Sequence, residues 1–183
     1  MKRLFLLLFL ASTLWGTSYS NALLEMHANI LPKIILMDYG YKERLVKGEI
    51  VIRILYDDNQ KVYGSKLEEL LEKAYPGGIR NLKIEAASLA YDDYLAHPQR
   101  ATMIYLLETD AKRISAAIRA ARKEKSLVFA VNPLYLERGA HASLEIGQKV
   151  RPYLNISALK EDGISFRAAL MRIAKLYHSG YPE

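Results

Sequence analysis

Residues 102–131, TMIYLLETDAKRISAAIRAARKEKSLVFAV, carry the pattern that decides the fold. Thr102–Leu107 is an apolar run typical of a fully buried strand, and Leu127–Val131 is a second one. Between them, Thr109 or Asp110 can cap a helix. The apolar face of that helix is formed by Ile114, Ala117, Ile118 and Ala121. Strand, helix and strand in this order predict a βαβ unit with parallel strands.

The same alternation continues upstream of this unit. Glu49–Tyr56 is rich in β-branched residues and precedes Asp57-Asp58-Asn59, which predicts a buried strand followed by a polar loop. The next helix has its apolar residues at i, i+3, i+4 and i+7, namely Leu67, Leu70, Leu71 and Ala74. Leu82–Ala86 alternates like a half-buried strand, and a polar linker follows it. Ahead of these elements, Leu23–Met37 is predicted as a helix that Pro32 should kink or shift.

Downstream, Ala142–Ile146 and Lys149–Asn155 are alternating runs joined by Gly147-Gln148, which predicts a β-hairpin. A terminal helix is expected to bury Phe166, Leu170, Ile173, Ala174 and Tyr177. The sequence therefore predicts the α/β class. We expect a single three-layer domain with a mostly parallel sheet, a C-terminal antiparallel hairpin and flanking helices.

The first residues have the pattern of a secretory signal peptide. Met1-Lys2-Arg3 is basic, Leu4–Leu10 is entirely apolar, and Ser20-x-Ala22 supplies small residues for cleavage. The apolar core is too short to cross about 30 Å of hydrocarbon comfortably. We therefore expect a signal peptide over residues 1–22, a mature domain over residues 23–183, and a periplasmic location.

Composition excludes several kinds of site. The 183 residues include no cysteine, so a disulfide framework, a thiolate zinc site, an iron–sulfur cluster and a cysteine nucleophile are all excluded. The net charge of +6 falls to +4 without Lys2 and Arg3. This mildly basic balance does not require nucleic acid, and export argues against it as a partner.

Motifs that carry chemistry are missing from the sequence. It contains no G-x-G-x-x-G, no G-x-x-x-x-G-K-[ST], no H-E-x-x-H and no G-x-S-x-G, and its four histidines are scattered. We expect no catalytic residues, no metal and no cofactor. The alternative interpretation is a small-solute site at the strand ends, with candidate contacts Asp57, Asp58, Asn132 and Arg138.

Two of the thirteen tyrosines are candidates for binding a partner. Tyr39 and Tyr41 flank Gly40 at the end of the first predicted mature helix. Tyrosine offers a large contact area and loses little side-chain entropy on binding, so it suits interfaces as well as core edges.

The second half of the chain resembles the YfiR-like family of exported proteins. The resemblance is carried by Leu127–Pro133, Leu136–His141, Lys149–Lys160, Gly163–Phe166 and Leu170–Ala174. These segments are similar to the family's strand and turn, its Gly-containing loop, its strand with an IN-x-x-A turn, its Gly-hydrophobic-Ser step and its terminal helix. The motifs are structural rather than catalytic.

The resemblance implies an exported α/β protein. The best-known member of the family is a periplasmic repressor of an inner-membrane diguanylate cyclase, released by an outer-membrane-associated partner. It couples envelope stress to cyclic-di-GMP and biofilm formation. The present chain departs from the family pattern at three points. Asp38-Tyr39-Gly40-Tyr41 replaces a tryptophan-proline, Gly139-Ala140 replaces a double glycine, and the redox-sensing cysteines are missing.

The leading hypothesis is thus a non-enzymatic periplasmic regulator. It would bind the periplasmic part of a membrane signalling protein, with a diguanylate cyclase as the candidate suggested by the resemblance. The alternative is a periplasmic small-solute-binding protein. A dispersed hydrolase site has no support in the sequence. A homodimer and an outer-membrane-associated partner remain open.

Overall fold

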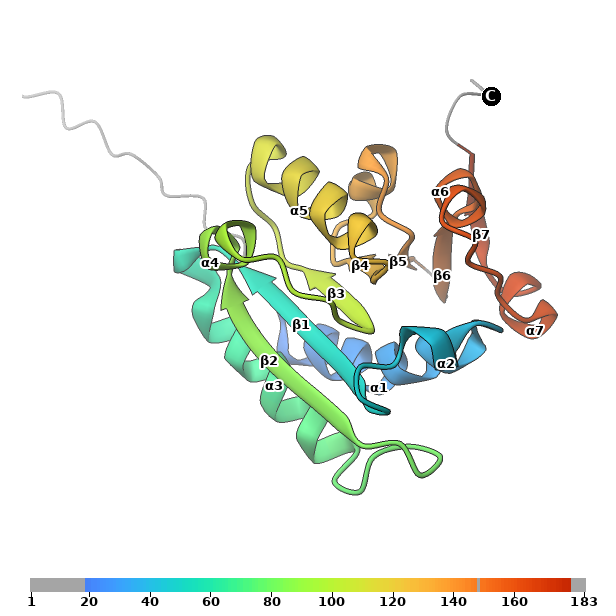
Figure 1. The fold of residues 1–183 in the computed structure, drawn as a ribbon, viewed down its shortest axis with the longest axis horizontal. Helices are drawn as coiled ribbons and strands as arrows, with labels where there is room; N and C mark the ends of the chain where they lie inside the picture. The colour runs from blue at the N-terminus through green and yellow to red at the C-terminus, as the bar shows by residue number, and fades with distance from the viewer. Residues whose placement is uncertain (1–18, 148, 179–183) are drawn as a thin grey trace, which may run out of the picture.

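The computed structural model describes residues 19–147 and 149–178. Within them, seven strands form one sheet in the order β2-β1-β3-β4-β5-β6-β7 (Figure 1). The strands are β1 (Ile50–Tyr56), β2 (Ile84–Ala90), β3 (Met103–Leu106), β4 (Leu127–Ala130), β5 (Ala142–Ile146), β6 (Val150–Asn155) and β7 (Lys175–Tyr177). All neighbours pair in parallel except β5 and β6, which are antiparallel. The predicted fold class is therefore confirmed, including the late antiparallel pair.

Helices cover both faces of this sheet. The α-helices are α1 (Asn21–Met37), α2 (Tyr41–Arg44), α3 (Lys61–Ala74), α4 (Tyr91–Ala96), α5 (Ala111–Lys123), α6 (Ile156–Glu161) and α7 (Ala168–Met171). Two 3₁₀ helices are η1 (Asp58–Gln60) and η2 (Pro133–Arg138). One apolar cluster lies between the sheet and α1 with α3, and a second lies between the sheet and α4 with α5 (Figure 1). Among the described residues, no helix is both long and apolar enough to cross a membrane.

The core under α1 contains an aromatic group built around His27. The rings of Tyr105 and Phe129 stack with centroids 5.8 Å apart, and the His27 ring meets both edge-on. His27 is 1% exposed, and its Nδ1 lies 2.6 Å from the Tyr105 hydroxyl. The other ring nitrogen, Nε2, is buried without a hydrogen-bond partner. Burial lowers the pKa of His27 from 6.5 to about 4, so the folded protein holds a neutral imidazole.

Two predictions about local structure were incomplete. The strand predicted at Leu82–Ala86 starts and ends later, because Ile84–Ala90 pairs residue by residue with β1. The polar linker after it contains α4, whose Tyr91 and Tyr94 rings are 1% exposed. The hydroxyl of Tyr91 donates to the Leu107 carbonyl oxygen at 2.6 Å. The two buried tyrosines therefore hold α4 against the fold. This segment was predicted as a linker because of its acidic residues, Asp92 and Asp93.

The prediction of a long terminal helix was wrong. The chain forms the short α7 and then β7, which pairs in parallel with β6. Phe166 and Leu170 are buried as expected, but Ile173 is 58% exposed. A short apolar run fits helix and strand periodicities equally well, and here the open edge of β6 favours the strand. The expected helix at the N-terminal side is confirmed as α1, which continues through a buried Pro32.

Because Ile173 is exposed, truncation of its side chain should cost little stability, whereas a buried Ile173 would have made the same change costly. Ile173→Ala should change the free energy of unfolding by less than about 0.5 kcal/mol, as is usual at surface sites. Leu170→Ala, which empties a buried position three residues earlier, should cost at least about 2 kcal/mol. Denaturant melts of the two variants provide the comparison. Equal losses in both would show that Ile173 is packed in solution.

Candidate functional site

The exit of α1 presents Tyr39 to solvent on a fixed backbone. Tyr39 is 64% exposed, and its backbone N–H donates to the Ser165 carbonyl oxygen at 2.8 Å. The Arg167 guanidinium lies over its ring, 5.4 Å from the centroid. The ring is thus exposed, while the backbone that carries it is held by the hydrogen bond to Ser165.

Asp38 is the anchor of this turn. Its carboxylate is buried and accepts the Arg44 Nε–H at 2.7 Å and the Gly40 backbone N–H at 3.0 Å. Asp38 also forms an isolated antiparallel bridge with Phe166, and the Arg167 N–H donates to the Met37 carbonyl oxygen at 2.8 Å. Two segments far apart in the sequence are therefore fixed together directly under Tyr39.

A hollow adjoins Tyr39 through Met37 and Arg167. Its volume is about 470 Å³. Its apolar wall is formed by Leu36, Met37, Ile79 and Ala169, and its basic residues are Lys33, Arg80 and Arg167. No acidic residue is among these described lining residues. The hollow and Tyr39 together, called the α1-exit surface below, offer an apolar contact area with a basic rim.

Tyr41 is placed differently from Tyr39. It begins α2 and is half-buried, with its ring packed against the cluster under α1. The structure therefore separates the two tyrosines that the sequence paired, and Tyr39 is the more exposed of the two.

The alternative candidate residues meet only in part. A crevice of about 360 Å³ lies at the carboxyl ends of β1, β3 and β4, and Asp57 and Asn132 are among its lining residues. Asp58 is exposed at the start of η1 and does not line the crevice. Arg138 lies beside α5, with its Nη1 3.4 Å from the Ser115 hydroxyl. Of the four residues proposed as contacts for a solute at the strand ends, two line the crevice there, Asp57 and Asn132.

Most polar groups in this crevice already have partners. The Thr109 hydroxyl donates to Asp57 at 2.8 Å, and the Asn132 amide donates to Glu108 at 2.9 Å. Gln60 is the exception, because its side chain is 4% exposed and its Oε1 has no hydrogen-bond partner.

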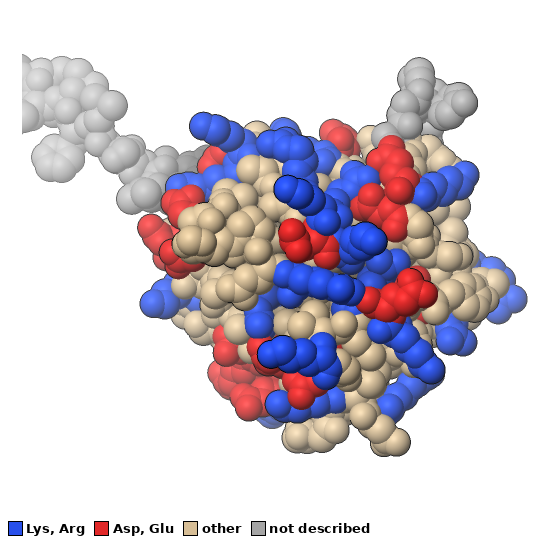
Figure 2. All heavy atoms as spheres, viewed as in Figure 1, with Lys and Arg blue, Asp and Glu red and all other residues tan. Residues whose placement is uncertain are grey.

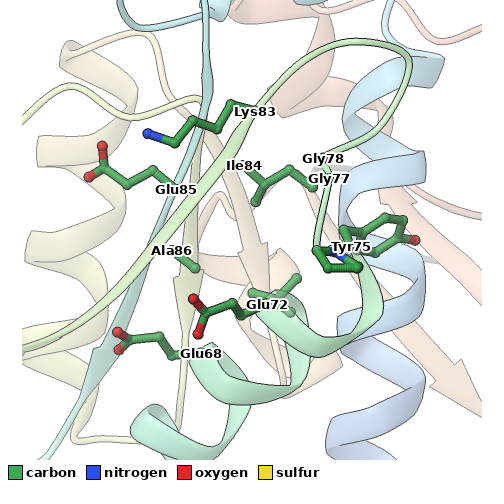
Figure 3. A pocket seen from close by; sticks show the side chains of 11 residues that line it. Glu68, Glu72, Tyr75, Gly77, Gly78, Lys83, Ile84, Glu85 and Ala86 are labelled. Atoms are coloured by element: carbon green, nitrogen blue, oxygen red, sulfur yellow. The ribbon is translucent and has the colours of Figure 1, made fainter.

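A second groove runs between α3 and the edge strand β2, with a volume of about 460 Å³. Glu68 and Glu72 project from α3 toward β2, where Glu85 and Lys83 lie (Figure 3). Glu68 accepts both the N–H and the O–H of Ser88 at 3.0 Å, and Glu85 accepts the Arg53 guanidinium at 2.6 Å. Glu68 therefore fastens α3 to β2, and Glu85 links β2 to β1.

A part-buried His–Asp–Arg network joins α5, the residue just before β5 and the C-cap of α6. Asp162 accepts the His141 Nε2–H at 2.8 Å and the Arg122 Nε–H at 2.6 Å. His141 Nδ1 accepts the Val128 N–H at 2.9 Å, so neither ring nitrogen is free to act as a base toward a nucleophile. Partial burial acts to raise the pKa of Asp162, but the bonds from His141 and Arg122 outweigh it and hold the pKa below its ordinary value. No sequence pattern pointed to this network.

Charges on the face that carries α5 are interleaved rather than gathered by sign (Figure 2). Arg113 pairs with Asp57, Asp92 and Asp110, and Arg122 pairs with Glu161 and Asp162. Within the described residues, no group of three or more His, Asp or Glu side chains could hold a metal ion.

Comparisons with known proteins agree with this architecture. A solved structure named as a conserved domain protein from Vibrio cholerae O1 biovar El Tor matches with a TM-score of 0.59 and 20% identity, over 84% of this chain and 59% of that one. A structure of an ABC domain in complex with L-Trp from Streptococcus pneumonia matches with a TM-score of 0.55 and 12% identity, over 80% and 61%. The chain thus spans about three fifths of either structure, and these identities show the fold alone.

No curated protein matches the chain. A family model described as YfiR/HmsC-like matches residues 42–175, which include strands β1 to β6, Arg44 and the His–Asp–Arg network. Since this match covers well over half of the sequence, the chain belongs to the YfiR/HmsC-like family.

Proposed function

We propose that the protein is an exported, non-enzymatic regulator that binds the periplasmic part of a membrane signalling protein. A diguanylate cyclase is the candidate of choice, because the best-known member of the family represses one from the periplasm. Cyclic-di-GMP signalling and biofilm formation would then lie downstream. An outer-membrane-associated protein would be the candidate for releasing the repression.

The observation that carries this proposal is the α1-exit surface. A regulator without a catalytic site must act through a surface that another protein can recognise. Exposed aromatic residues with restricted conformations are typical anchors of such contacts. The basic rim of Lys33, Arg80 and Arg167 favours a partner segment that combines apolar and acidic residues.

Removal of the Tyr39 ring tests this surface. Tyr39→Ala should leave the melting temperature nearly unchanged, because the ring is 64% exposed, and should weaken binding by about 1–2 kcal/mol or more. The measurement is a titration with the periplasmic domain of a candidate diguanylate cyclase from the same organism, beside thermal melts. Tyr41→Ala should instead lower the melting temperature, since that ring packs on the core.

Leu134→Ala is the matched control for this titration, because Leu134 is 63% exposed on η2, away from α1. Arg80→Glu should weaken binding and Arg119→Glu, on α5, should not. Normal binding by both Tyr39→Ala and Arg80→Glu would show that the partner uses another surface.

A second proposal is solute binding in the crevice at the strand ends. It is supported by one observation, the unpaired Gln60 carbonyl in a crevice that also exposes Asp57 and Asn132. A single domain offers no second lobe to close over a solute, which is why we rank this proposal below the first.

A further inference from the structure

Tyr19 is the first described residue, and it already belongs to the packed fold. Its side chain is 7% exposed, and its ring meets the Tyr63 ring edge-on with centroids 5.1 Å apart. The Tyr19 hydroxyl accepts the backbone N–H of Glu108 at 3.0 Å, and the Gln60 side chain hydrogen-bonds to the same phenol. Tyr19 therefore contacts Glu108 and Gln60, two residues that line the crevice at the ends of β1 and β3.

Ser20 is the N-cap of α1. Its hydroxyl oxygen accepts the Leu23 N–H at 3.2 Å, and its carbonyl oxygen accepts the Leu24 N–H at 3.2 Å. The first bond satisfies one of the amide donors that a helix start leaves without partners inside the helix, and the second is the first backbone hydrogen bond of the helix. The first turn of α1 contains no acidic residue that could replace this cap.

Cleavage after Ala22 would remove these contacts. The Glu108 N–H would lose its acceptor, Tyr63 would lose its aromatic neighbour, and the helix would lose its cap. The new ammonium group on Leu23 would stand in the first turn of the remaining helix, where positive charge opposes the helix dipole. Tyr19 and Ser20, whose contacts the fold uses, would be discarded together with the exposed Asn21 and Ala22.

We propose that the signal peptide is cut between Ser18 and Tyr19, so that Tyr19 is the first residue of the mature protein. Gly16 and Ser18 supply small residues three and one positions before this bond, as signal peptidases require. The step is hydrolysis by the export peptidase: water adds across the Ser18–Tyr19 peptide bond and yields a carboxylate on Ser18 and an ammonium group on Tyr19. The inference rests on the proposed export of the protein, and it moves the cut four residues upstream of the position expected from Ser20 and Ala22.

The first residue of the exported protein decides the matter. The full chain is expressed in a bacterium with its own export system, recovered from the periplasm, and examined by N-terminal sequencing and intact mass. We expect Tyr19 as the first residue. A start at Leu23 or at any other residue overturns the proposed cut while leaving export intact, whereas recovery of only the uncut chain in the membrane fraction overturns both.

Two matched variants place the cut independently. Ser18→Leu removes the small residue before the proposed bond and should cause uncut protein to accumulate. Ala22→Leu does the same at the other position, on an exposed helical residue, and should give normal processing with the same first residue. The reverse pattern would overturn the proposal.

The role of Tyr19 in the fold has its own readout. In processed protein, Tyr19→Ala should lower the melting temperature, whereas Ala22→Leu should not. An unchanged melting temperature for Tyr19→Ala would remove the structural reason for the proposed cut.

Discussion

Acidification from pH 7 to pH 4 should cost the folded protein about 3 kcal/mol through His27 alone. The pKa of His27 is about 4 in the folded protein because of burial, against 6.5 for the exposed group. The unfolded chain therefore binds the proton first, and the stabilisation present above pH 6.5 is lost progressively as the pH falls toward 4. The gap between these pKa values converts to about 3 kcal/mol. Tyr105 already uses Nδ1, and no acceptor faces Nε2, so the imidazolium would have no counter-charge.

His27→Phe isolates this effect. Phenylalanine keeps an aromatic ring against Tyr105 and Phe129 but cannot be protonated. The variant should be less stable than the wild type at pH 7, because the buried Tyr105 hydroxyl loses its partner. Its further loss between pH 7 and pH 4 should be smaller than that of the wild type by about 3 kcal/mol.

Urea melts across this pH range measure both quantities. His141 and the carboxylates are present in both proteins, so their contribution cancels in the difference. His97→Phe, on an exposed residue, is the control and should follow the wild-type pH dependence. A parallel pH dependence for wild type and His27→Phe would contradict the buried neutral imidazole.

Agreement between sequence and structure is best where one pattern has one physical cause. Thr102–Leu107 and Leu127–Val131 were predicted because fully buried parallel strands tolerate no polar face, and both contain buried strands. The helix between them was predicted from an apolar stripe, and all four residues of that stripe are buried. Strand β7 was missed because three residues carry no periodicity, and only the open edge of β6 selects their conformation.

The candidate sites, too, could be predicted only where one local pattern or the sheet topology determines the position of a residue. Asp57 and Asn132 converge because parallel strands end at one edge, which a topology prediction includes. Asp58 does not join them, since adjacent residues point in different directions. Tyr39 and Tyr41 have the same residue type and near-identical positions, yet one is exposed and the other packed. The backbone at Tyr39 is held by Ser165 and Phe166, which lie more than one hundred residues away in the sequence, so residue spacing alone could not separate the two tyrosines.

The His–Asp–Arg network was the hardest feature to predict from the sequence. Asp162 is 21 residues from His141 and 40 residues from Arg122, so no local pattern joins them. Its value can be measured at Asp162. Asp162→Ala should cost about 3 kcal/mol of unfolding free energy, because it leaves the His141 Nε2–H without a partner at a side chain that is 0% exposed. Arg122 would keep only Glu161, at 2.7 Å.

Two neighbouring substitutions make this prediction specific. Asp162→Asn keeps an oxygen for the His141 Nε2–H but loses the charge that pairs with Arg122, so its cost should lie between the wild type and Asp162→Ala. Glu161→Ala removes the adjacent carboxylate from the same arginine. That carboxylate is 64% exposed, so the loss should stay below about 1 kcal/mol. Thermal and urea melts at pH 7 rank the three variants. Equal costs for Glu161→Ala and Asp162→Ala would show that the buried histidine does not depend on Asp162 for its hydrogen bond.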